Sequence, residues 1–222
     1  MLYLVPTPVG NLKDITLRAL ETLQEVDLIL CEDTRTSSKL LQHYQIQKPL
    51  SPFHQHNEHK VVPHLVEQLS AGKKIALITD AGTPGISDPA FLLVRAAVQA
   101  GIQVQTLPGA TAFVPALVSS GLPAHSFFFE GFLPVKKGRK TRLTALAALP
   151  VTFILYESPL RLPRTIADLI EHCGGDRKAS VSREISKMFE EHVRGSLQEL
   201  ADHFKQHPPR GEIVMVIEGI ED

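Results

Sequence analysis

The stretch KIALITDAGTPGISDPAFLLVRAA, residues 74–97, decides the fold. Its apolar start, Ile75 to Ile78, has no polar alternation, which is typical of a parallel strand covered on both faces. Ala81 to Gly85 holds two glycines and a proline, so it cannot continue the strand and leaves the main chain open to close approach. Asp88 and Pro89 then suit the N-cap and first position of a helix, because an Asp oxygen caps well and Pro needs no N–H there. The helix is predicted to bury Phe91, Leu92, Val94 and Val98. A ligand is expected where strand, loop and helix follow one another in this way.

Apolar runs and helical patterns alternate on both sides of this stretch. Further strands are predicted at 2–5, 28–31, 50–53 and 104–107, and Asp14 is predicted to cap the helix that follows the first of them. This rhythm predicts an α/β domain with a mainly parallel sheet over residues 1–120. Gly121-Leu122-Pro123 breaks the chain, and residues 121–222 are predicted to form a second α/β domain with a mixed sheet. There, Ser158 and Pro159 are predicted to begin a helix, and Ser196 with Glu199 to form a capping box.

The bulk composition excludes several classes of protein. The 222 residues are 43% hydrophobic and 21% charged, which suits a folded protein, and the net charge of −1 argues against coating nucleic acid by bulk charge. Two distant cysteines fit a reducing compartment better than a disulfide framework. No run approaches the ~20 apolar residues of a membrane span. We therefore expect a cytoplasmic protein without a membrane segment.

Polar side chains follow two of the predicted strands. Glu32 and Asp33 come directly after the second strand, and capping of the next helix is an alternative explanation for Asp33 but less so for Glu32. His54, His56 and His59 follow the third strand, without a cysteine or carboxylate partner that would suggest a metal. No metal site is predicted. Both a polar pocket wall and a solvated loop whose Asn57 caps a helix remain open for this segment.

A local basic cluster lies in the second predicted domain. Its five cations fall within seven residues: Lys136, Lys137, Arg139, Lys140 and Arg142. Cations at a helix N-terminus oppose the helix dipole, so the cluster does not serve helix stability. Contact with the phosphates of a nucleic acid is the favoured interpretation, and a solvated helix start is the alternative.

Four predicted strand ends carry loops rich in Gly and Pro, at residues 6–11, 80–85, 108–112 and 156–159. The two commonest nucleotide-binding loops, GxGxxG and GxxxxGK[ST], are absent from the sequence. Convergence of these loops would form a cleft between two domains, lined mostly by main-chain groups. A flat, partly cationic cofactor would suit such a cleft.

Eight motifs in order carry a resemblance that covers nearly the whole chain: TPVGNLKDITLRAL, CEDTR, FHQHNE, TDAGTPGISDPA, SGLP, GFLP, YESP and REISKMFEE. They resemble the group of ribosomal small-subunit (16S) RNA cytidine 2'-O-methyltransferases in the tetrapyrrole methylase superfamily. The resemblance implies two α/β domains, a homodimer, and S-adenosylmethionine bound in a cleft between the domains. It implies small-subunit ribosomal RNA, within the subunit, as the substrate.

The resemblance implies most of the cofactor contacts, and the polar loops and the basic cluster supply the expected contacts with RNA. The expected cofactor contacts are Pro8, Asp80, Ala81, Gly82, Thr83, Ile86, Thr111, Ala112 and Tyr156. The expected RNA contacts are Asn11, Arg35, His56, Asn57, Lys136, Lys137, Arg139 and Lys140. Glu32 is the preferred general base, with His54 or His56 as the reserve, and contact with the ribose or the cofactor ammonium group is an alternative role for Glu157.

The sequence departs from this group at several positions. Ala110-Thr111 replaces the usual Pro-Ser, Ala90 replaces a common glycine, and Leu160 stands where a histidine usually follows YESP. Some relatives continue beyond the equivalent of Asp222, so RNA contacts of that extra segment are expected to be absent or replaced. Two other functions remain open: C-methylation of a tetrapyrrole or another small molecule, and RNA binding without catalysis.

Overall fold

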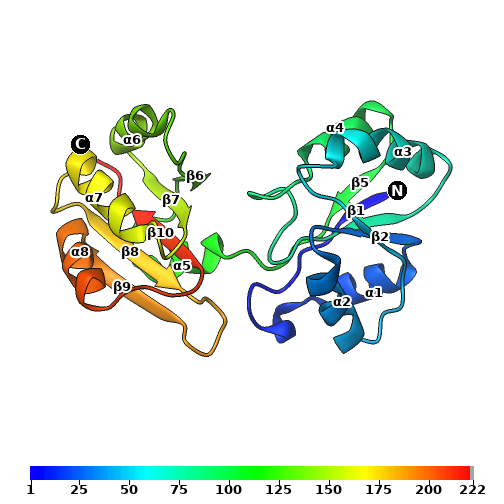
Figure 1. The fold of residues 1–222 in the computed structure, drawn as a ribbon, viewed down its shortest axis with the longest axis horizontal. Coiled ribbons are helices and arrows are strands. Elements are labelled where there is room, and N and C mark those ends of the chain that lie inside the picture. Colours follow the sequence, from blue (N-terminus) through cyan, green and yellow to red (C-terminus); the bar gives the residue numbers. More distant parts are fainter. Residues whose placement is uncertain (221–222) are drawn as a thin grey trace. The chain divides into compact units, whose positions relative to one another are not determined.

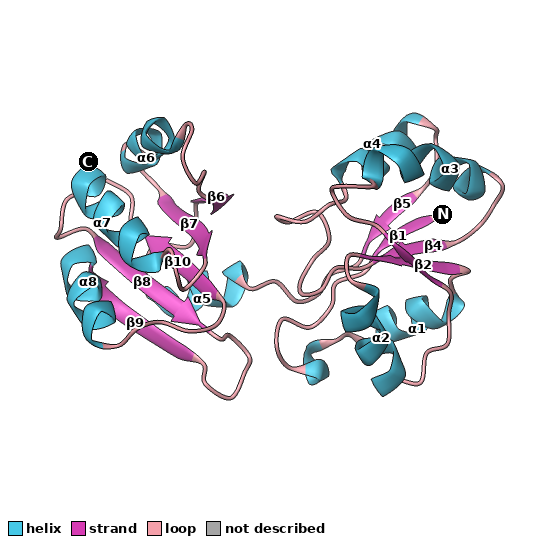
Figure 2. Ribbon diagram, viewed as in Figure 1, coloured by secondary structure: helices cyan, strands magenta, loops and turns pink. Residues whose placement is uncertain are grey.

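The computed structural model describes residues 1–220. They fold as two compact units: the first is Met1–Thr111, and the second begins at Ala112 and is described as far as residue 220 (Figure 1). Each unit combines one five-stranded sheet with helices (Figure 2). The predicted pair of α/β domains is confirmed. No helix among the described residues is long and apolar enough to cross a membrane.

The sheet of the first unit is parallel throughout, as predicted. Its strands lie in the order β3-β2-β4-β1-β5. Their bounds are β1 Leu2–Leu4, β2 Leu28–Cys31, β3 Leu50–Pro52, β4 Ile75–Leu77 and β5 Val104–Thr106. All three residues of the central strand β4 are buried, which explains its lack of polar alternation.

Helices cover both faces of this sheet. They are the 3-10 helix η1 Leu12–Asp14, α1 Leu17–Glu25, α2 Thr34–His43, α3 Glu58–Ser70 and α4 Phe91–Gln99. On one face, Ile75 and Leu77 of β4 share a core with side chains of α3 and α4. On the other face, Ala76 and Ile78 share a core with α1 and α2. The two helix layers lie on opposite sides of the sheet in Figure 2.

Two predicted helix starts in this unit are wrong. Thr16, not Asp14, caps α1, because its hydroxyl accepts from the Ala19 N–H at 3.1 Å. Helix α4 begins at Phe91, with Ala90 at the N-cap and no side-chain cap. Asp88 is therefore not a cap, and its carboxyl group has another role.

The predicted buried face of α4 is also partly wrong. Leu93 and Ala97 are its buried residues, whereas the side chains of Phe91 and Val98 are 69% and 61% exposed. The segment is apolar at almost every position, so its pattern does not distinguish one helix face from another. The sheet, not the sequence period, sets the orientation of this helix.

The second unit has a mixed sheet in the order β6-β7-β10-β8-β9. Its strands are β6 Phe127–Phe132, β7 Thr152–Glu157, β8 Lys178–Arg183, β9 Glu191–Ser196 and β10 Ile213–Ile217. Only the β6–β7 pair is parallel, and the other three pairs are antiparallel. The predicted mixed sheet is confirmed.

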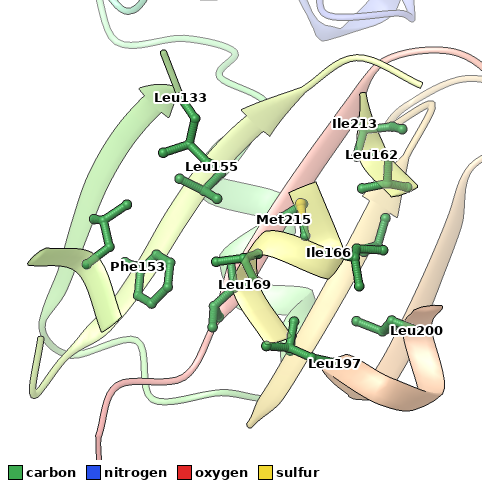
Figure 3. Close-up of a cluster of buried hydrophobic side chains, with 14 of the residues drawn as sticks. Leu133, Phe153, Leu155, Leu162, Ile166, Leu169, Leu197, Leu200, Ile213 and Met215 are labelled. Atoms are coloured by element: carbon green, nitrogen blue, oxygen red, sulfur yellow. The ribbon is translucent and has the colours of Figure 1, made fainter. Parts of the chain in front are cut away.

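Three helices cover one face of this sheet and one covers the other. Helices α6 Arg139–Ala147, α7 Leu162–Cys173 and α8 Leu197–Gln206 pack on the core drawn in Figure 3, where Leu155 and Met215 of the sheet meet Ile166 and Leu169 of α7. Helix α5 Phe113–Ser120 packs on the opposite face against Ile154 and Val214. The Ser196–Glu199 capping box of α8 is confirmed.

Two further expectations about this unit differ from the structure. Helix α7 begins at Leu162 with Pro163 in its first turn, so Ser158 and Pro159 lie in the turn before it and not at its start. The two compact units divide between Thr111 and Ala112, ahead of the predicted boundary at residue 120. Helix α5 belongs to the second unit because Ala116 and Leu117 are buried against its sheet.

Candidate functional site

The parallel strands of the first unit all end at one edge of the sheet. We call the loops there the carboxyl edge: residues 5–11, 32–33, 53–57, 78–90 and 107–111, which follow β1, β2, β3, β4 and β5. Ligands of open parallel sheets bind at this edge. The sequence therefore places Glu32, His54 and Asp80 together through topology alone.

The loop after β4 is tied to the loops after β1 and β5. Thr7 and Gly82 exchange two backbone hydrogen bonds of 2.9 Å, and the Thr7 hydroxyl donates to the Thr79 carbonyl at 3.0 Å. The Thr83 hydroxyl donates to the Ala110 carbonyl, also at 3.0 Å. Three of the predicted Gly/Pro loops thus form one connected framework.

Two glycines permit this framework. Gly82 has φ +84°, a left-handed conformation that glycine adopts without strain. A Cβ atom at Gly109 would lie 2.6 Å from Cβ of Pro6, closer than atoms can pack. Glycine is therefore favoured at position 82 by the backbone conformation and at position 109 by the close approach of Pro6.

Three carboxyl groups at the carboxyl edge have raised pKa values. Burial is the largest cause for each of Glu32, Asp80 and Asp88. The charge of Asp80 further raises the pKa of Glu32, and the charges of Glu32 and Asp80 add to the effect of burial to raise the pKa of Asp88 to about 7. Carboxylates that repel one another in this way favour a cationic ligand, which would relieve the repulsion.

Asp33 differs from these three carboxyl groups. Arg35 donates to it from its guanidinium at 3.1 and 2.8 Å and from its backbone N–H at 2.8 Å, and these bonds lower the pKa of Asp33 to about 2. Asp33 is also the N-cap of α2, so capping does explain this residue. Arg35, an expected RNA contact, is exposed and paired with Asp33.

An electrostatic interaction with His54 partly offsets the rise in the pKa of Glu32. The His54 ring lies 5.9 Å from the exposed ring of His56, and its Nδ1 atom is buried without a hydrogen-bond partner among residues 1–220. Asn57 accepts from the His54 backbone N–H at 2.9 Å and donates to the Pro52 carbonyl. Its side chain shapes the histidine loop and does not cap α3.

The other expected ligand contacts divide between the two units. Pro8, Ala81 and Ile86 are half-buried in loops of the carboxyl edge, and Thr111 ends that unit. Asn11 is exposed and its side chain caps η1. Ala112 and Tyr156 belong to the second unit, where Tyr156 lies near the carboxyl end of β7. Within the described chain, no group of three or more His, Cys, Asp and Glu side chains is arranged to hold a metal ion.

The basic cluster of the second unit divides into exposed and engaged cations. Arg139 is 5% exposed, and its guanidinium donates to Asp168, Thr165 and the Pro134 carbonyl at 2.7, 2.8 and 3.1 Å. The expectation that Arg139 contacts RNA is therefore wrong. Arg142 pairs with Glu130. The exposed members are Lys136, Lys137 and Lys140, none of which forms an ion pair within residues 1–220.

Glu157 is engaged by partners within the second unit, which argues against contact with ribose or cofactor. Its side chain is fully buried and accepts hydrogen bonds from the Ser158 N–H at 2.8 Å and the Thr165 hydroxyl at 2.6 Å. Arg161 lies 3.2 Å away as its counterion. A buried carboxylate with these partners holds the start of α7 in place.

Two residues of the carboxyl edge were not identified as part of the site from the sequence. Thr7 is buried and its hydroxyl ties two loops together, but a single Thr in a Pro-rich segment carries no distinguishing pattern. For Asp88 the local sequence predicts a helix cap, because Asp followed by Pro suits a helix start. Its proximity to Glu32 and Asp80 depends on the path of the loop, which no local pattern predicts.

Comparison with known proteins identifies the family. A family model described as Tetrapyrrole (Corrin/Porphyrin) Methylases matches residues 1–201. The chain belongs to this family. A relative from Mesorhizobium japonicum is 50% identical over 97% of this chain and 74% of its own length. A relative from Synechocystis is 50% identical over 99% of this chain and 79% of its own length. A third, from Thermotoga maritima, is 44% identical over 99% of both chains. All three are named ribosomal RNA small subunit methyltransferase I.

Solved structures confirm the fold of this tetrapyrrole methylase. A diphthine synthase is 16% identical with a TM-score of 0.77, over 98% of this chain and 89% of its own. The uroporphyrin-III C-methyltransferase from Thermus thermophilus, solved with S-adenyl homocysteine, is 20% identical with a TM-score of 0.68, over 98% and 96%. At these identities the likeness establishes the shared fold and not a shared substrate.

Proposed function

We propose that the protein transfers a methyl group from S-adenosylmethionine to the 2'-hydroxyl of a cytidine in small-subunit ribosomal RNA. The observation that carries this proposal is the 44 to 50% identity, over nearly the whole chain, to proteins named for methylation of that RNA. We expect the enzyme to work as a homodimer in the cytoplasm, on RNA within the small ribosomal subunit.

The residues of the carboxyl edge fit such a cofactor. S-adenosylmethionine carries a sulfonium and an ammonium group, and Glu32, Asp80 and Asp88 form a group of carboxyls whose mutual repulsion a cation would relieve. The Gly82 loop offers main-chain groups that no Cβ screens. When bound, S-adenosylmethionine supplies an activated methyl group.

The main chemical task left to the protein is to prepare the hydroxyl. A ribose 2'-hydroxyl is a poor nucleophile at neutral pH, so a base that accepts its proton assists the transfer. Glu32 is the proposed base because it follows β2 at the carboxyl edge, has a raised pKa and caps no helix. Asp80 and His54 lie close enough to affect its charge. Orientation of hydroxyl and methyl group in line supplies much of the remaining rate.

The test of the function is methyl transfer to its proposed substrate. The protein is incubated with radiolabelled S-adenosylmethionine and small subunits that lack the modification, and the labelled nucleotide is mapped. Label on the 2'-oxygen of one cytidine would support the proposal. Label on a base, or on a tetrapyrrole supplied instead, would refute it.

Gly82→Val tests whether the loop after β4 forms the cofactor site. Valine is strained at φ +84°, so the loop must shift away from Thr7 and the framework of the site is lost. We expect S-adenosylmethionine affinity to fall by roughly five- to 150-fold by calorimetry, given strain of about 1–3 kcal/mol. Gly101→Val is the matched control. Gly101 also has a positive φ, +69°, but it lies in the turn before β5, at the end of that strand away from the carboxyl edge. Equal affinities of wild type and Gly82→Val would contradict the assignment.

Asp88→Asn tests the electrostatic contribution to cofactor binding. Below pH 7 the Asp88 carboxyl is mostly neutral and above it mostly charged, because its pKa is about 7. Wild-type affinity for the cationic cofactor should therefore rise roughly fivefold as the pH rises through this value, which corresponds to about 1 kcal/mol from a partly screened charge. The variant should lack this step in calorimetric titrations at pH 6 and 8. An unchanged pH dependence in Asp88→Asn would exclude Asp88 as its source.

A further inference from the structure

Five aromatic rings form a continuous surface on the second unit. We call it the aromatic face: Phe113, Phe127, Phe129, Phe132 and Tyr156. Its neighbouring ring centroids lie 4.7 to 6.1 Å apart. Phe113, Phe129 and Tyr156 pack against the core on the α5 side of the sheet, so this part of the face is fixed by packing.

A β-bulge places Phe132 on this face. Phe129 pairs with Ile154, and Phe132 pairs with Tyr156. Between these two pairs β6 advances three residues, whereas β7 advances only two. The register shift lies between Phe129 and Gly131, and Gly131 adopts φ +73°. Without the extra residue, strict alternation would turn Phe132 to the opposite side of the sheet. Bulges of this kind commonly re-aim a side chain for a function.

The ring of Phe132 is not used to build the core. Its side chain is 54% exposed at the end of β6, the edge strand of the sheet, and its neighbouring ring is Tyr156, at 5.6 Å and 61°. The bulge thus keeps a large, exposed apolar ring beside the other rings of the aromatic face. Such a ring indicates a contact surface.

The segment after Phe132 is held rigidly and leads to the free lysines. Arg161 donates to the Leu133 carbonyl at 2.7 Å, and the buried Arg139 donates to the Pro134 carbonyl. Lys136 and Lys137 follow, exposed. The chain from residue 132 to 136 spans at most about 14 Å, so an exposed ring and exposed cations lie within reach of one ligand.

We propose that Phe132 stacks on an unpaired base of the RNA substrate while Lys136 and Lys137 contact the adjacent phosphates. This inference rests on the proposed function and specifies the form of RNA that is recognised. Aromatic rings beside cations are the usual combination for single-stranded RNA, because every base has a face that can stack and every nucleotide carries a phosphate. Glu130, the acidic residue within β6, is neutralised by Arg142 and does not oppose this contact.

The experiment measures binding of a ten-nucleotide single-stranded oligocytidine RNA, with an RNA duplex of equal length for comparison. Wild type should prefer the single strand. Phe132→Ala should weaken single-strand binding about tenfold or more with an unchanged salt dependence, since the lost stacking is not ionic. Phe132→Trp should retain the affinity. Lys137→Ala should weaken binding and make the slope of log affinity against log salt shallower by about 0.7.

Two controls keep the result specific. Phe189→Ala removes an exposed ring outside the aromatic face, in the loop between β8 and β9, and should leave affinity unchanged. Each variant is also titrated with S-adenosylmethionine. If wild type methylates small subunits but Phe132→Ala binds oligocytidine equally well, the inference is overturned and the proposed function stands. Loss of cofactor affinity in Phe132→Ala would also overturn it. If wild type neither binds nor methylates RNA, the proposed function fails as well.

Discussion

Glu32→Gln should lower the rate of methyl transfer by about 10²- to 10⁴-fold at saturating RNA and cofactor, the usual contribution of a general base. Glutamine keeps the shape of the side chain but cannot accept the proton of the ribose hydroxyl. The affinities for RNA and cofactor should change little, because the lost interaction belongs to the transition state. Single-turnover rates with labelled cofactor provide the measurement.

The pH profile distinguishes a base from a residue that only shapes the site. Burial and the charge of Asp80 raise the pKa of Glu32, so the wild-type rate should increase with pH as this carboxyl ionises, and then level off. In Glu32→Gln the remaining rate should lack that increase. A residue with a purely structural role would lower the rate at every pH by the same factor.

Matched variants test whether the loss is specific to position 32. Glu32→Asp keeps a carboxylate but shortens the reach, so it should lose less activity than Glu32→Gln. Glu21→Gln in α1 removes an exposed carboxylate away from the carboxyl edge and should have no effect. A near-normal single-turnover rate in Glu32→Gln would remove this residue from the mechanism, and His54→Ala would then be tested in the same way.

The strands of the first unit could be predicted because buried parallel strands leave a strong signal. The central strands β1, β2 and β4 are short apolar runs ended by Pro or a charged residue, as at Ile75 to Asp80, whereas the edge strands β3 and β5 contain Ser, Gln and Thr. Their parallel arrangement in turn predicts that Glu32, His54 and Asp80 meet at one edge. This part of the site follows from topology and needs no knowledge of individual contacts.

Details that depend on tertiary contacts could not be predicted. Asp and Thr are both residue types that cap helices, so the sequence does not choose between Asp14 and Thr16. The structure shows that the Thr16 hydroxyl accepts from the Ala19 N–H. Likewise, Asp88 suited a cap by composition, whereas the turn through Ser87, at φ +66°, carries it to the other carboxyls. In each case the capping preference of Asp predicts a local role, but contacts with residues distant in sequence determine the role that the residue has.

The basic cluster shows that residue type alone does not predict which side chains are exposed. Five cations in seven residues predict a surface for phosphates, but only the exposed cations can contact a phosphate. Arg139 points into the unit and Lys140, its neighbour, does not. Helical geometry turns adjacent residues about 100° apart, so neighbours in such a cluster serve different purposes.

Arg139→Ala should therefore destabilise the second unit instead of weakening RNA binding directly. The substitution removes hydrogen bonds to Asp168, Thr165 and the Pro134 carbonyl. Removing one partner of a buried ion pair costs about 3–5 kcal/mol, and the cost here should be about 2–4 kcal/mol. The lower range applies because Asp168 is 25% exposed and has Arg164 at 3.9 Å as a second cation.

Chemical denaturation followed by circular dichroism measures this loss, fitted with two transitions if the units unfold separately. Lys140→Ala is the matched control: its side chain is exposed, and its removal should change the free energy of unfolding by no more than about 0.5 kcal/mol. Arg139→Lys keeps the charge but not the planar fork that reaches three acceptors at once, so its loss should be intermediate. If Arg139→Ala kept wild-type stability and lost RNA affinity with a shallower salt slope, Arg139 would contact phosphate after all, and its buried position would have to open when RNA binds.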